Sequence, residues 1–213
     1  MSQQYRRSRT RDWLRQEGLE ISSSLPFLEE SLVLSRSAGE IADRAAILSV
    51  MALAAHHPHA RGVLIQWLKH EALWDLLAPT ETVFVESAKP SRSDVSSMSW
   101  CSEATFALCW VLGVAGIDGG ALHACPDDLR WKLPDVSKGE SMKAFREHSV
   151  SRGTDDLLDA LDRIYCLHWR QTEDALQGLV RSYPLSPPAV VQRRWAFEWL
   201  FSRFDWNQVS LDT

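Results

Sequence analysis

Residues 37–55 read SAGEIADRAAILSVMALAA, and this stretch decides the fold class. A serine followed three positions later by a glutamate, Ser37 and Glu40, is the capping-box pattern that begins many helices. Apolar residues then recur at the three- and four-residue spacing of one helix face, at Ile41, Ala45, Leu48, Ala52 and Ala55. We therefore predict a long helix that begins at Ser37, ends near Pro58 and buries one side.

Helical signals continue on both sides of this stretch, and alternation of the kind that marks a strand is not convincing anywhere. The sequence predicts further helices at residues 10–18, 26–34, 63–74 and 100–114, from Thr154 onward, and from Ser186 to about Phe204. Because the signals are helical throughout, we expect an all-α protein, an irregular bundle of about seven to nine helices with little or no β structure.

One polar, serine-rich stretch, residues 91–99, interrupts the apolar pattern and is predicted to be a loop. It divides the main part of the chain, residues 37–213, into two possible subdomains, 37–90 and 100–213. Residues 1–36 are expected to form an N-terminal helical extension, whose arginines suggest a solvated helix or tail.

Composition narrows the classes of partner and compartment. The 213 residues carry a formal charge of -5, which argues against nucleic acid as a ligand and suits a basic partner. The basic start is not followed by the apolar segment of an export signal, and the longest apolar run is too short for a membrane span, so a cytoplasmic protein is expected. The four cysteines lack metal-ligand spacing and are predicted to be free thiols.

Five charged or titratable residues lie on stripes that are otherwise apolar, and these are the most informative positions: Arg44, Glu103, Asp162, His168 and Arg194. An isolated buried charge costs several kcal/mol even after relaxation, so each of these groups is expected to pair or to shift its pKa. In the favoured interpretation they form a structural polar network that fixes the register of the helices.

The alternative interpretation is catalytic. Glu103, Asp162 and His168 would then form a general acid-base set, and Arg194 or Arg44 would hold an anionic substrate. No nucleophile-elbow, P-loop, zinc-protease or kinase motif supports an enzyme class, so we assign no catalytic residue. The histidines at positions 56, 57 and 59 lack a completing carboxylate spacing, and we expect neither a metal nor a cofactor.

Several short motifs, each weak by itself, recur in order along the chain. They are Glu40-Ile41-Ala42, Arg44-Ala45, Pro79-Thr80-Glu81, Trp100, Ser102-Glu103-Ala104, Trp110, Asp162, Tyr165, His168-Trp169, Arg193-Arg194, Ala196, Trp199-Leu200, Asp205-Trp206 and Asp212-Thr213. Together they resemble the bacterial domain-of-unknown-function family 4272, from about Ser37 to Thr213. The resemblance implies an all-helical bacterial fold and no catalytic assignment. One departure is Gln192, where the family pattern has a glutamate before the paired arginines.

Two functions from different classes remain open at this stage, and a third possibility is a homo-oligomeric scaffold that uses exposed aromatic residues. The first is a protein-binding module, most concretely a cytoplasmic immunity protein that neutralises a basic antibacterial toxin, perhaps a nuclease, with Asp155, Asp156 and Asp159 steering the partner. The chain is small, acidic, helical and rich in tryptophan, as such an antagonist would be. The second is an enzyme of unknown class that uses the acid-base set described above.

Overall fold

The fold is built around helix α2 (Ala38–His56), the helix predicted from residues 37–55. In this computed structural model, residues 1–29, 31–115, 125–183 and 185–211 are described. The predicted capping box is present, since the Ser37 hydroxyl accepts the Glu40 N–H and the Glu40 carboxylate accepts the Ser37 N–H. α2 ends at His56, and His57 separates it from a short 3-10 turn that begins with Pro58.

The other elements of the described residues are helices too, and no strand occurs among them, so the all-α prediction is confirmed. The α-helices are α1 (Gln3–Gln16), α3 (Arg61–His70), α4 (Pro79–Glu86), α5 (Arg92–Ser99), α6 (Cys101–Val111), α7 (Met142–His148), α8 (Thr154–Leu176) and α9 (Pro187–Phe201). The 3-10 turns are η1 (Pro58–Ala60), η2 (Trp74–Leu76), η3 (Asp127–Lys132), η4 (Val136–Lys138) and η5 (Trp206–Gln208). None of the described helices has the length and apolar character needed to cross a bilayer.

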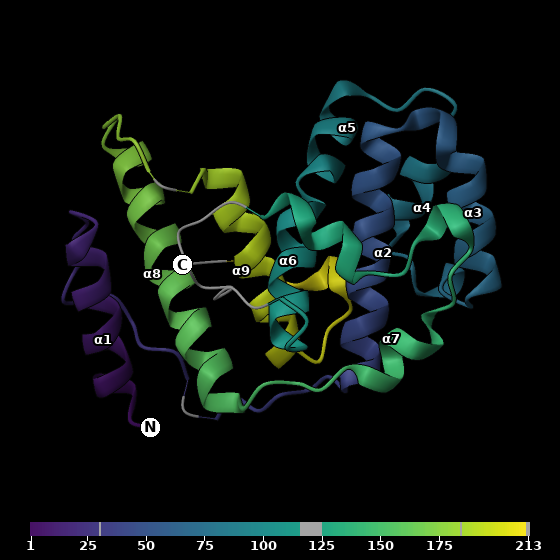
Figure 1. The fold of residues 1–213 in the computed structure, drawn as a ribbon. Coiled ribbons are helices and arrows are strands. Elements are labelled where there is room, and N and C mark those ends of the chain that lie inside the picture. Colours follow the sequence, from purple (N-terminus) through teal and green to yellow (C-terminus); the bar gives the residue numbers. More distant parts are fainter. Residues whose placement is uncertain (30, 116–124, 184, 212–213) are drawn as a thin grey trace.

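The core lies in a row of packed helices. α2 packs on α6, α6 on α9 and α9 on α8, while α1 lies along the outer side of α8 (Figure 1). Ile47, Phe106, Leu161 and Phe197, one from each of the four central helices, are completely buried. Because each central helix has apolar neighbours on two sides, its charged residues must find partners within the protein.

The loop predicted at residues 91–99 is wrong, because this stretch forms helix α5. The Ser91 hydroxyl accepts the Asp94 N–H and the Asp94 carboxylate accepts the Ser91 N–H, a capping box of the same kind as the one that begins α2. Serine favours helix starts as well as turns, so a serine-rich stretch does not by itself indicate a loop. α5 packs against α2, and buried apolar residues from both 37–90 and 100–213 belong to one core.

The helix predicted at residues 26–34 is also wrong, because no helix is present in the described part of this segment. The Arg7 guanidinium donates to the carbonyl oxygens of Leu25 and Pro26, and the Leu200 carbonyl accepts the Ser35 N–H. These groups therefore bond to distant parts of the chain instead of to a local helix. The first helix begins earlier than predicted, at Gln3, and the last ends earlier, at Phe201.

Candidate functional site: an acidic cavity beside paired buried charges

The five residues on apolar stripes do not form one connected network. Arg44, Glu103, Asp162 and Arg194 are all at most 5% exposed, and His168 is partly buried. Four of the five have partners outside the set, and the one contact within it joins His168 and Arg194.

Glu103 pairs with Arg193, the residue beside the predicted Arg194. Two guanidinium nitrogens of Arg193, Nε and Nη2, lie 2.9 and 2.7 Å from Oε2 of Glu103. The other carboxylate oxygen accepts the N–H of Cys125. A charged partner and a backbone N–H thus satisfy this carboxylate, and its pair with Arg193 joins α6 to α9.

Asp162 pairs with Arg7, which comes from the N-terminal segment. The guanidinium donates to Asp162 through Nε and Nη2, at 3.1 and 2.8 Å from Oδ1, and the Arg7 side chain is 1% exposed. Burial alone would lower the pKa of Arg7, but its hydrogen bond to Asp162 and the nearby acidic groups together outweigh burial and raise this pKa. The pair therefore stays ionised and attaches α1 to α8.

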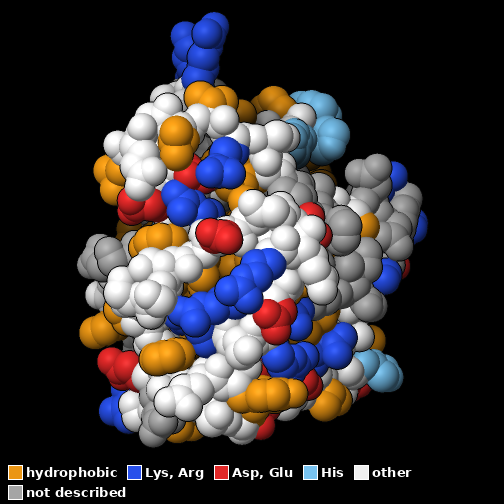
Figure 2. All heavy atoms as spheres, turned by 90° about the vertical axis from the view of Figure 1, so that its left-hand side faces the viewer, with side chains coloured by type: hydrophobic (Ala, Val, Ile, Leu, Met, Phe, Trp, Pro, Cys, Tyr) orange, Lys and Arg blue, Asp and Glu red, His pale blue; other side chains and the backbone are white. Residues whose placement is uncertain are grey.

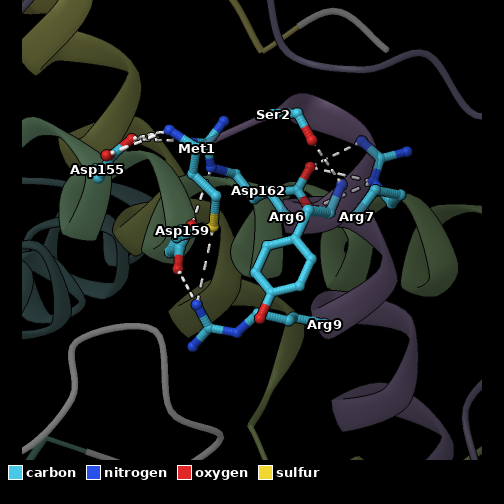
Figure 3. A network of polar contacts seen from close by, with 9 residues as sticks. Met1, Ser2, Arg6, Arg7, Arg9, Asp155, Asp159 and Asp162 are labelled. Atoms are coloured by element: carbon cyan, nitrogen blue, oxygen red, sulfur yellow. Dashed lines mark hydrogen bonds and ion pairs between the residues drawn. The ribbon is translucent and has the colours of Figure 1, made fainter.

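Two of the three acidic residues proposed to steer a partner, Asp155 and Asp159, lie near this attachment (Figure 3). Asp159 contacts Arg6 and Arg9 at 2.9 and 2.8 Å, and Asp155 contacts Arg6 at 3.2 Å and the N-terminal ammonium at 3.3 Å. Asp156 is exposed and makes no ion pair with the described residues. The acidic start of α8 is thus largely neutralised by the basic start of the chain.

His168 and Arg194 contact each other beside the Tyr165 ring. The Arg194 Nη1 lies 2.6 Å from Nδ1 of His168, and its guanidinium carbon lies 5.0 Å from the Tyr165 ring centroid. Burial and the adjacent Arg194 charge lower the pKa of His168 to about 4. His168 is therefore neutral at pH 7 and accepts the hydrogen bond. Burial raises the pKa of Glu198, which also contacts Arg194 at 3.3 Å.

Sequence reasoning missed the partners Arg7, Glu81 and Arg193. Arg193 and Arg194 are neighbours on α9, and successive helix positions point about 100° apart, so one faces α6 and the other α8. Two adjacent arginines in this helix could therefore have predicted two separate buried contacts, one on each side of the helix. Glu81 stands three residues after Ala78, at the position where a side chain can accept the first N–H groups of a helix.

Arg44 lines a cavity beside α2. Its Nη1 lies 2.8 and 3.0 Å from the two Glu81 oxygens, and its Nη2 donates to the Leu76 carbonyl at 2.6 Å. Its guanidinium carbon lies 5.3 Å from the centroid of the Trp206 ring. Through its contacts with Leu76, Glu81 and Trp206, Arg44 thus joins α2 to η2, α4 and η5.

The cavity itself has a volume of about 410 Å³. Its lining comes from four parts of the chain: Arg36, Glu40, Asp43, Arg44 and Ile47; Asp75, Leu76, Leu77, Ala78 and Pro79; Trp199; and Asp205, Trp206, Asn207 and Gln208. Trp199 and Trp206 meet edge to face with centroids 5.6 Å apart, and Arg36 stacks 4.7 Å from Trp199. Many of the residues that carry the family resemblance therefore meet at this cavity.

Carboxylates outnumber cations in the lining, four to two. Asp43 pairs with Arg146 at 2.6 Å, and hydrogen bonds from Ser37 lower the pKa of Glu40. Asp75 and Asp205 are exposed and form no ion pair within the described ranges. Both arginines are engaged by protein groups, so the lining as a whole favours a cationic ligand over an anionic one. We call this hollow the acidic cavity.

Comparison with known proteins gives one result. No curated protein and no solved structure matches the sequence. The family described as Domain of unknown function (DUF4272) matches residues 6–209. The match starts within the segment expected to be an N-terminal extension, and it includes most of α1 with Arg6, Arg7 and Arg9. Nearly the whole chain is covered, and the protein therefore belongs to the DUF4272 family.

Proposed function

We propose that this protein is a protein-binding module of the bacterial cytoplasm, an immunity protein that neutralises a cognate antibacterial toxin by direct binding. In this proposal the acidic cavity receives a basic side chain of the toxin. The observation that carries it is the cavity lining, in which Asp75 and Asp205, two carboxylates that form no ion pair with any described residue, lie beside apolar and aromatic walls.

The lining suits the two parts of an arginine or lysine side chain. Leu77 and Pro79 can contact the apolar stem, and Asp75 and Asp205 can pair with the charged head. Trp199 and Trp206 already stack on the guanidinium groups of Arg36 and Arg44, which fixes the walls before a ligand enters. A fixed site loses less entropy on binding.

Long-range charge supports the same class of partner. A net charge of -5 attracts a basic protein and raises its association rate. Within the trio Asp155, Asp156 and Asp159, the arginines of α1 neutralise two members, so steering from this region rests mainly on Asp156. The acidic cavity therefore makes the specific contact with the partner in this proposal, and the start of α8 contributes little to steering.

The enzyme alternative receives less support from the geometry. It requires Glu103, Asp162 and His168 to reach one substrate, but Glu103 and Asp162 each pair with a different buried arginine. His168 contacts a third arginine. No cluster of these three groups is present to act on a shared ligand.

Affinity capture of the tagged protein from its native cytoplasm tests the proposal, because it identifies partners by mass spectrometry. We expect one stoichiometric basic protein with toxin activity that the captured complex suppresses. The double variant Asp75→Asn and Asp205→Asn should lose most of this capture. Both residues are exposed, so the variant should fold normally.

A matched control removes two exposed carboxylates elsewhere, with Glu86→Gln and Glu147→Gln. This control makes the net charge less negative by the same amount and should retain most of the capture. Equal loss in both variants would show that only overall charge matters, and would contradict a specific role for the cavity. Recovery of the protein alone at every salt concentration would contradict the binding function itself.

A further inference from the structure

Helices α1 and α8 lie side by side and run in the same direction, and their facing charges change along the pair (Figure 1). At their N-terminal ends the charges are opposite, with Arg6 against Asp159 and Arg7 against Asp162. Two helical turns later they are alike, because Arg15 and Arg170 line the same cavity. Like charges repel, so the second arrangement costs free energy unless an anion lies between them.

This basic end forms a groove of two adjoining hollows, of about 360 and 170 Å³. The two hollows share Arg15, Leu19 and Glu20. The larger adds Arg170 and Arg181, and the smaller adds Arg11. Figure 2 looks at the side of the molecule that carries α1 and α8, and a band of Lys and Arg side chains crosses it. We call this feature the arginine groove; its lining holds four arginines and one carboxylate, in a chain that is acidic overall.

The buried carboxylate of Asp174 positions two of these arginines. Arg170 Nη2 lies 2.5 Å from Oδ1 and Arg181 Nε lies 3.1 Å from Oδ2, while the Tyr183 hydroxyl also donates to this carboxylate. Burial alone would raise the pKa of Asp174, but the hydrogen bonds from Tyr183 and Arg170 outweigh burial and lower it. Asp174 therefore remains an anion that fixes both guanidinium groups.

The guanidinium of Arg181 keeps donors available after this pairing. Its Nε is the atom that contacts Asp174, its side chain is 48% exposed, and its two Nη groups make no hydrogen bond within the described part of the chain. Arg15 is 64% exposed, and among the described residues its one ion pair is with Asp12, at 3.4 Å, a surface pair of little strength. Both side chains can therefore turn their N–H groups toward a ligand.

The turn after α1 completes the groove. Gly18 has a φ of +71°, and Leu19 donates its N–H to the Leu14 carbonyl, which reverses the chain at the end of the helix. This brings the Glu20 carbonyl to 3.5 Å from Arg170 Nη1 and buries Leu19 against the core. The turn thus holds Arg15 of α1 beside Arg170 of α8 and Arg181, which follows α8 in the sequence.

We propose that the arginine groove binds the phosphate group of a small phosphorylated ligand. Converging guanidinium groups offer several N–H donors in planar forks, which match the oxygens of a phosphate. A phosphate dianion would also relieve the repulsion between Arg15 and Arg170 more fully than a single carboxylate would. A small ligand fits better than nucleic acid, because the groove is local and the net charge of -5 would repel a long polyanion.

Isothermal titration calorimetry with sodium pyrophosphate, at constant ionic strength, tests this proposal. The wild-type protein should show saturable binding at one site. The double variant Arg15→Gln and Arg181→Gln should bind at least about tenfold more weakly, because two charge-assisted contacts are lost. Since both side chains are exposed, circular dichroism should show an unchanged fold for this variant.

The control is Arg92→Gln with Arg203→Gln, which removes two exposed arginines outside the groove and should leave the affinity unchanged. Equal weakening in both double variants would overturn the proposal, because binding would then follow overall charge alone. The absence of saturable binding to the wild-type protein would overturn it too. Acetate that competes as well as inorganic phosphate at equal ionic strength would overturn the assignment to phosphate.

Discussion

Arg193 of α9 and Glu103 of α6 form a buried ion pair in which Nη2 lies 2.7 Å from Oε2 and the Arg193 side chain has no exposed surface. The guanidinium carbon also lies 4.4 Å from the centroid of Phe106, so the pair is enclosed by apolar and aromatic atoms. A pair of this kind contributes little net stability when intact, but the loss of one partner leaves an uncompensated charge inside the protein. It fixes how α6 and α9 align.

Replacement of Glu103 by glutamine should therefore lower the free energy of unfolding by about 3–5 kcal/mol. Urea unfolding followed by circular dichroism measures the change. Glu86→Gln, at an exposed position near the end of α4, is the control and should change stability by less than about 0.5 kcal/mol. A Glu103→Gln protein as stable as the wild type would show that the pair is not buried as described.

The attachment of α1 to α8 gives a second prediction. Arg7→Met removes the buried partner of Asp162 and two hydrogen bonds to backbone carbonyls, and it should cost about 3–5 kcal/mol. Arg9→Met, at a residue whose side chain is 46% exposed, should cost less than about 1 kcal/mol.

Limited proteolysis provides a local measurement of the same difference. Cleavage between α1 and α2 should become faster in the Arg7→Met protein and stay near the wild-type rate in the Arg9→Met protein. Equal protection in both variants would mean that the Asp162 pair does not hold α1 in place.

Short-range patterns made most of the fold predictable. The capping box at Ser37 and Glu40 and the apolar periodicity after it depend only on residues within a few turns, and both are present in α2. The same local reasoning failed at Ser91, where serine-rich composition concealed a second capping box. It failed again at residues 26–34, where Arg7 and Leu200 bond to the backbone from far along the chain.

The candidate sites were predictable in part. A charge on an apolar stripe correctly marked Arg44, Glu103, Asp162 and Arg194 as buried. Their partners were not predictable, because pairing depends on tertiary contacts: Arg7 and Asp162 are 155 positions apart. The acidic cavity and the arginine groove also combine distant segments, so no local sequence pattern identifies either one.

Stability should fall as the pH is lowered, partly because of His168. Its pKa is about 4 in the folded protein, against 6.5 as the ordinary value, so the unfolded chain binds the additional proton first. Its contribution is therefore fully present above about pH 6.5 and is lost progressively as the pH falls toward 4.

Urea unfolding at several pH values between 4 and 7 tests this dependence. His168→Gln should flatten the slope relative to the wild type, while His59→Gln, at an exposed histidine, should leave the slope unchanged. An identical slope in the His168→Gln protein would show that other groups dominate acid sensitivity in this range.

Thiol reactivity should separate the four cysteines by burial. Burial raises the pKa of Cys101 to about 12 and also raises those of Cys109 and Cys166, whereas Cys125 is only partly buried. Because the thiolate is the reactive form, Ellman's reagent at pH 8 should modify Cys125 first, and Cys125→Ser should remove this fast phase. The other three thiols should react only when the core opens, at rates that increase with urea. Modification of Cys109 or Cys166 as fast as Cys125 would mean that the interface between α6, α8 and α9 opens far more readily than its packing indicates.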